Sequence, residues 1–147
     1  MNKIWINKEV KDRDITKKFV KGIIEEILKK LDLDGVEVSI TLTDDESIRE
    51  LNKNWRGKDK ATDVLSFPIN EKPLGYKYKV LGDVVISIPY AKRQAEEIGF
   101  SYKEEVLRLL IHGILHLLGY DHEKSEEEAK IMFSIQDKIF EDLRKEL

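Results

Sequence analysis

Apolar residues recur along the chain at two spacings, one typical of helices and one typical of strands. After Thr16, which can cap a helix, apolar residues follow each other at helical intervals as far as residue 31. Strict alternation of apolar and polar residues from Val36 to Leu42 predicts a half-buried strand. Shorter strand-like runs at residues 4–6, 63–69 and 82–88 predict three more strands.

Capping and stop signals place two shorter helices among these strands. Thr43 and Glu46 predict a capping box that opens one helix. This helix should end near Trp55, because Gly57 follows it. Pro89 suits the first turn of the other helix, which should run to about residue 98 before the glycine at position 99.

The most apolar segment lies in the last third of the chain. Ser101 and Glu104 repeat the capping-box pattern, and residues 106–118 are apolar on nearly every side of a helix, which predicts burial. Ser125 and Glu128 can cap a last, amphipathic helix. The order β-α-β-α-β-β-α-α-α predicts an α+β fold in which about five helices cover a small mixed four-stranded sheet. No repeat or linker divides residues 1–147, so we expect a single domain.

The composition excludes several kinds of catalytic and metal-binding site. The 147 residues contain 26 Lys and Arg against 29 Asp and Glu, a net charge of -3 that neither requires nor excludes nucleic acid. There is no cysteine, so disulfides, a thiolate nucleophile and cysteine-ligated metals are excluded, and any metal must rest on His, Asp or Glu. No apolar run approaches the roughly 18 residues of a membrane span, and we expect neither secretion nor membrane insertion.

All three histidines of the chain fall within eleven residues. His112 and His116 share one face of the predicted buried central helix, where residues four apart can bind one ion together. His122 cannot reach that ion from a straight helix, because zinc binds nitrogen at about 2.0–2.1 Å. Gly119 allows the chain to turn back after the helix. The spacing therefore predicts a metal site on this helix, and the alternative is three core or capping histidines.

The number of ligands favours catalysis. Three histidines without a fourth protein ligand describe an open site, whereas structural zinc sites are closed by four ligands. Metzincin proteases share these spacings but carry a glutamate base directly after the first histidine, where this chain has Gly113. A metzincin-like peptide hydrolase is therefore the less favoured interpretation. Met132 is interpreted as a core residue rather than as part of a methionine turn.

Several separated motifs resemble those of the YbeY family of bacterial endoribonucleases. The resemblance covers most of the chain after about residue 40 and rests on Leu51-Asn52, Trp55-Arg56, residues 61–67, Leu81-Gly82-Asp83, Gln94-Ala95, residues 112–122 and Met132-Phe133 with Gln136. It implies a cytoplasmic, zinc-dependent endoribonuclease, a hydrolase that cuts single-stranded RNA. Its implied task is the maturation of small-subunit (16S) ribosomal RNA and ribosome quality control.

The resemblance also implies roles for particular residues. The family's three zinc-binding histidines correspond to His112, His116 and His122, with one Zn²⁺ per chain. Its functionally important arginine corresponds to Arg56, whose alternative role is a surface ion pair. Trp55 stands where the family often has tyrosine. The implied partners are single-stranded RNA, ribosomal RNA and the small ribosomal subunit, with no membrane and no DNA.

Positive charge is concentrated in the middle of the chain. Residues 52–79 contain seven basic and three acidic residues, a net charge of +4. We expect Lys53, Lys58 and Lys60 to bind substrate beside Arg56, which can bind two phosphate oxygens and stabilise the transition state. Unpaired bases could stack on an aromatic set in the same region, namely Trp55, Tyr76 and Tyr78. On charge alone, a solvated surface is the simpler interpretation.

Two questions stay open at the level of sequence. The general base could be Asp121 or Asp83, or the RNA 2′-hydroxyl could itself be the nucleophile. The chain could also be a non-catalytic, zinc-stabilised assembly factor that binds ribosomal RNA without cutting it. In each case only neutral imidazole binds metal, so metal affinity should weaken as the pH drops through about 6.5.

Overall fold

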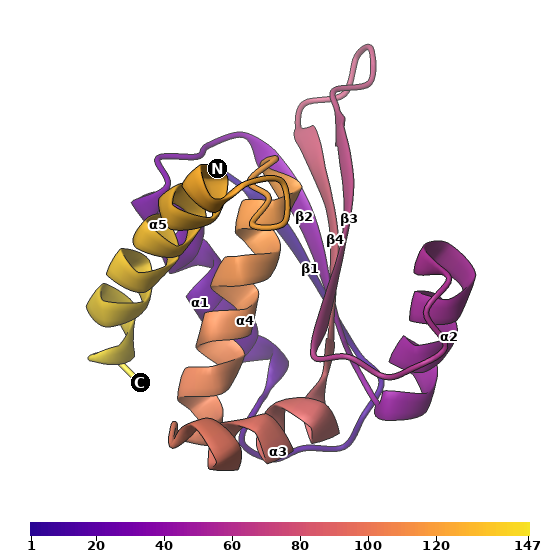
Figure 1. The fold of residues 1–147 in the computed structure, drawn as a ribbon. Coiled ribbons are helices and arrows are strands. Elements are labelled where there is room, and N and C mark those ends of the chain that lie inside the picture. The colour runs from indigo at the N-terminus through magenta and orange to yellow at the C-terminus, as the bar shows by residue number, and fades with distance from the viewer.

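Four strands form one mixed sheet in the order β1-β2-β4-β3 (Figure 1). The structure is a computed structural model that describes residues 1–147. The strands are β1 (Lys3–Lys8), β2 (Val36–Thr43), β3 (Val64–Glu71) and β4 (Lys79–Ser87). The helices are α1 (Lys17–Lys30), α2 (Asp45–Arg56), α3 (Ile88–Ile98), α4 (Tyr102–Leu117) and α5 (Glu126–Arg144). The predicted fold class and element order are confirmed.

Strands β1, β2 and β4 are parallel, and the edge strand β3 pairs with β4 in the antiparallel sense. The pairing of β2 with β4 is irregular beside Gly82, whose φ is +141°. A Cβ at this position would lie 2.3 Å from the carbonyl oxygen of Phe67 on β3. Glycine is therefore required for the close approach of the two strands.

The two faces of the sheet are covered unequally (Figure 1). Helices α1, α4 and α5 lie over one face and α2 lies over the other. Successive residues of β4 point to opposite faces, so Val84 and Ile86 join the main core while Val85 joins a small cluster with Ile48 of α2 and Leu65 of β3. The main core contains 27 buried residues.

Helix α4 lies at the centre of this core. It begins with the predicted capping box, in which Ser101 Oγ accepts from the Glu104 amide and the Glu104 carboxylate accepts from the Ser101 amide. The helix packs so closely on the sheet that a Cβ at Gly113 would lie 2.6 Å from Val84 Cγ1. His112 and His116 are only half buried, because they lie on the side of the helix that faces a cavity.

One predicted helix start is wrong by a residue. The N-cap of α2 is Asp44, whose Oδ1 accepts from the Ser47 amide at 2.8 Å, and not Thr43, which is the last residue of β2 and is buried. The predicted end is confirmed, because Gly57 caps the helix with a φ of +70°. None of the helices combines the length and the apolar character that crossing a membrane requires.

Candidate metal centre

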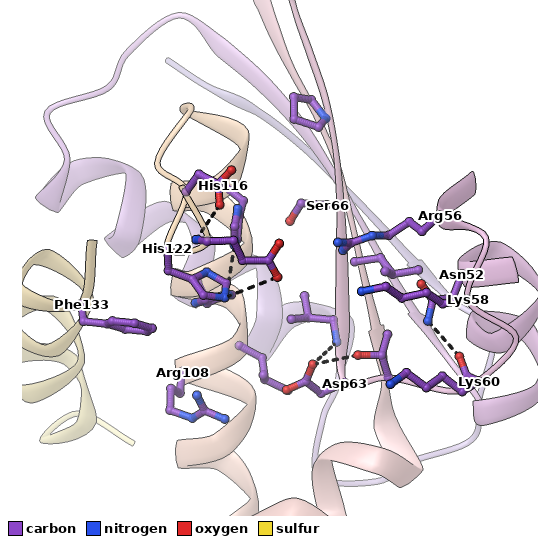
Figure 2. Close-up of a pocket in the computed structure, with 18 residues that line it drawn as sticks. Asn52, Arg56, Lys58, Lys60, Asp63, Ser66, Arg108, His116, His122 and Phe133 are labelled. Atoms are coloured by element: carbon purple, nitrogen blue, oxygen red, sulfur yellow. Dashed lines mark hydrogen bonds and ion pairs between the residues drawn. The ribbon is translucent and has the colours of Figure 1, made fainter. Parts of the chain in front are cut away.

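A tight turn after α4 brings the third histidine back to the first two. The Gly119 amide donates to the His116 carbonyl and the Tyr120 amide to the Leu115 carbonyl, while Gly119 has a φ of +98°. This left-handed glycine ends the helix as predicted and reverses the chain. His122 consequently lies over the last turns of α4 (Figure 2).

The three imidazoles form a compact cluster. The ring centroids are 4.7 Å apart for His112 and His116, 5.1 Å for His112 and His122, and 5.2 Å for His116 and His122. One nitrogen from each ring can be chosen so that all three lie within 4.8 Å of one another. Two nitrogens that bind one tetrahedral zinc at about 2.0–2.1 Å are themselves about 3.4 Å apart, and the Nε2 atoms of His112 and His116 are 3.1 Å apart.

The environment of the three imidazole rings favours the binding of a cation. His112 Nδ1 donates to Gln136 Oε1 at 2.7 Å, which fixes the tautomer whose Nε2 carries a lone pair toward the cluster. Burial lowers the pKa of His112, and burial together with the two neighbouring rings lowers the pKa of His116 from 6.5 to about 4. His122 Nδ1 is buried without a hydrogen-bond partner. Two rings with lowered pKa values beside a third with an unpartnered buried nitrogen fit a metal ion, and they fit three core histidines poorly.

The lowered pKa values change the expected pH dependence of metal binding. A proton competes with the metal for an imidazole only near or below the pKa of that ring. Since the pKa values of His112 and His116 lie below the ordinary 6.5, we expect affinity to hold to a lower pH than the sequence suggested and to be lost by about pH 4. Zinc titrations between pH 7 and 4 would measure this, and a tenfold loss already complete at pH 6.5 would contradict it.

The cluster opens onto a cavity of about 510 Å³ (Figure 2). Only four of its 18 lining residues are hydrophobic. The histidines form one wall. Arg56 at the end of α2 and Lys58 and Lys60 in the following loop form the opposite wall. The three-histidine cluster therefore faces a row of cations across a polar space.

Of the other residues singled out from the sequence, Asp121 lines this cavity and several lie outside it. Lys53 does not line it, and neither does Trp55. Tyr76 and Tyr78 pair with each other at 5.9 Å, and the Tyr76 hydroxyl donates to Glu37. Asp83 points to the opposite face of the sheet from Val84, and burial raises the pKa of its carboxyl.

Sequence reasoning missed a buried ion pair on the histidine side. Glu105 is 0% exposed and accepts two hydrogen bonds from Arg108, at 2.6 and 2.7 Å. Gln94 of α3 donates to Glu105 Oε2 at 2.5 Å and to Asp63 Oδ2 at 2.9 Å, which joins α3 to α4 and to the residue just before β3. Arg108 lines the cavity one turn before His112. Its spacing of three residues from Glu105 was the only sequence signal.

The protease interpretation fails on packing as well as on sequence. Any side chain at position 113 would collide with Val84, because the Cβ alone would lie 2.6 Å from Val84 Cγ1. The glutamate that metzincins carry there cannot be accommodated. Acids do line the cavity, but they come from other segments, namely Asp63, Asp121 and Glu123.

Fold and site together define a class of protein, an α+β protein whose buried central helix carries a three-histidine cluster that could hold a metal ion, opposite a basic wall. Comparison with known proteins identifies the family. A family model described as Endoribonuclease YbeY matches residues 4–144, and the chain belongs to the YbeY family.

Individual relatives agree with this assignment over nearly the whole chain. The Endoribonuclease YbeY of Persephonella marina is 70% identical, over 98% of this chain and 94% of its own. That of Sulfurihydrogenibium sp. is 69% identical, over 99% of this chain and 95% of its own. The solution structure of TM1509 from Thermotoga maritima superposes with a TM-score of 0.68 at 31% identity, covering 99% of this chain and 91% of that one.

Proposed function

We propose that this protein is a zinc-dependent endoribonuclease that cuts single-stranded RNA, and that it acts in the cytoplasm on small-subunit (16S) ribosomal RNA during maturation and quality control. One observation carries the proposal: the three-histidine cluster and Arg56 face each other across one polar cavity. The printed name of its relatives, Endoribonuclease YbeY, supports the reaction class.

The basic wall accounts for the choice of a phosphodiester substrate. The guanidinium of Arg56 can bind two phosphate oxygens at once and stabilise the charge that develops in the transition state. Lys58 and Lys60 extend this positive wall along the loop and would bind neighbouring phosphates of the strand. A cavity of about 510 Å³ accepts a portion of a single strand but not a base-paired helix.

The histidine wall accounts for the chemistry. A zinc ion held by His112, His116 and His122 would supply Lewis acidity and lower the pKa of water toward about 7. Burial lowers the pKa of His112 and of His116, which favours the neutral form of these two rings, and Gln136 keeps His112 in the required tautomer. No fourth histidine or carboxylate belongs to the cluster, so one coordination position stays available.

Proton transfer falls to a group on the histidine side of the cavity or to the substrate itself. Asp63 is engaged through both oxygens, by the Val64 amide at 2.7 Å and by Gln94 at 2.9 Å. Asp121 accepts from the Glu123 amide through Oδ1, which leaves Oδ2 for a proton in transit. Asp121 is therefore the protein base that we propose, and the RNA 2′-hydroxyl is the alternative nucleophile.

Substitution of Arg56 by glutamine tests the basic wall. We expect kcat/KM on a single-stranded RNA to fall by about 10²–10³-fold, as for the loss of one transition-state donor, with bound zinc unchanged. Lys53→Gln is the matched control, because it removes a positive charge from the same helix outside the cavity and should cost little. Equal losses in the two variants would show that overall charge, and not Arg56, binds the substrate.

Zinc-loaded protein incubated with unstructured RNA and with a perfect duplex tests the activity as a whole. We expect cleavage of the unstructured strand alone. RNA that is bound with strong salt dependence yet left intact would identify a non-catalytic assembly factor instead.

A further inference from the structure

Phe133 is an apolar side chain in an unusual place. It lies near the start of α5, on which Met132, Ile139, Phe140 and Leu143 are buried in the core. The Phe133 side chain is instead 39% exposed and lines the polar cavity. Exposed phenylalanine forgoes the stabilisation that burial would give, so a ligand is the natural partner for its ring.

The ring of Phe133 lies directly beside the metal ligands. Its centroid is 6.3 Å from that of His112, with an angle of 23° between the two planes, and 5.6 Å from that of His122 (Figure 2). A nucleotide whose phosphate sits at the histidine cluster therefore places its own base, or the neighbouring base, within reach of this ring.

No other aromatic side chain lines the cavity apart from the histidines. Trp55 is 72% exposed but packs edge-on against Phe67 and does not line the cavity. The pair Tyr76 and Tyr78 is likewise absent from its walls. Among the aromatic residues other than histidine, only Phe133 on α5 lines the cavity, on the opposite wall from Arg56 (Figure 2).

We propose that Phe133 forms a nucleobase subsite, on which an unpaired base next to the scissile phosphate stacks while Arg56 holds the backbone. This subsite rests on the proposed endoribonuclease function and deepens it. Every base has a π-face, so stacking on phenylalanine selects no sequence but does require a base that is free of its partner and of its neighbours. The subsite gives a physical reason for specificity toward single strands.

The test pairs variants of Phe133 with RNA that lacks one base. Short single-stranded RNAs of one sequence, each with a single abasic ribose at a different position around the cut, are cleaved by the zinc-loaded wild type, Phe133→Leu and Phe133→Trp. For the wild type we expect one position at which base removal lowers kcat/KM by about 5–150-fold. Phe133→Leu should lose a similar factor on intact RNA and show no further loss at that position, and Phe133→Trp should restore both.

Controls separate stacking from support of the metal site. Ile131→Ala, an exposed apolar residue of the same helix that does not line this cavity, should leave the abasic profile unchanged. If Phe133 only supports the histidines, Phe133→Leu will bind zinc more weakly and keep the wild-type abasic profile, which overturns the subsite and leaves the nuclease in place. A zinc-loaded wild type that cuts none of the RNAs overturns the proposed function and the subsite together.

Discussion

Replacement of His116 by alanine is expected to abolish stable zinc binding and to lower kcat/KM on single-stranded RNA by more than about 100-fold. Changes in the residues that only support metal ligands already cost 10–100-fold in affinity or activity, and His116 belongs to the ligand set itself. The two rings that remain, His112 and His122, cannot complete a three-ligand site. Elemental analysis and a cleavage assay on the same preparation measure both effects.

The contrast with Arg56→Gln makes this result specific. Both variants should lose activity, but only His116→Ala should lose the metal, because Arg56 lies on the opposite wall of the cavity. Circular dichroism verifies that each variant is folded. A His116→Ala protein that keeps one zinc per chain, or that cleaves RNA at the wild-type rate, would refute the assignment of this ligand.

Replacement of Arg108 by alanine is expected to destabilise the protein by about 3–5 kcal/mol, because it leaves the carboxylate of Glu105 buried without its cation. Glu105 is 0% exposed, and the lost guanidinium donates two of its hydrogen bonds. For a chain of this size the melting temperature should fall by roughly 6–20 °C. Thermal unfolding of the metal-free protein measures the change without a contribution from zinc binding.

Arg49→Ala is the matched control for this second experiment. Arg49 pairs with Asp59 at 2.8 Å, but both side chains are more than half exposed, so the loss should be at most about 1 kcal/mol. A double substitution of the buried pair, Glu105→Leu with Arg108→Leu, should recover much of the stability, since no charge is then left unpaired. Similar small losses for Arg108→Ala and Arg49→Ala would show that the buried pair contributes no more than an exposed one.

Most helices and strands could be predicted because each buries one face, so its apolar residues recur at the period of that element. The alternation of Val36 to Leu42 matches a strand with one buried side. Residues 106–118 are apolar on nearly every side because α4 is enclosed by the sheet and by other helices, except where it faces the cavity. The predicted start of α2 was wrong by one residue because Thr43 and Asp44 can both cap a helix. In the structure Thr43 is buried as the last residue of β2, and Asp44 is the N-cap.

The clustering of the three histidines could be predicted because their spacing is local, four residues on a helix and then a glycine turn. The sequence could not show in the same way which of the basic residues line the cavity. Asn52 and Arg56 are four residues apart on the cavity face of α2, whereas Lys53 is rotated about 100° from Asn52, away from that face. The contact from Gln94 to Asp63 joins segments 31 residues apart, and no local pattern records it.

The proposed activity requires a single metal ion at the three histidines, so the decisive measurement is the rate of RNA cleavage as zinc is returned to the metal-free protein. We expect the initial rate on a single-stranded RNA to rise in proportion to added zinc and to stop rising at one equivalent per chain. A rate that is the same without zinc, or that continues to rise well beyond one equivalent, would contradict the assignment.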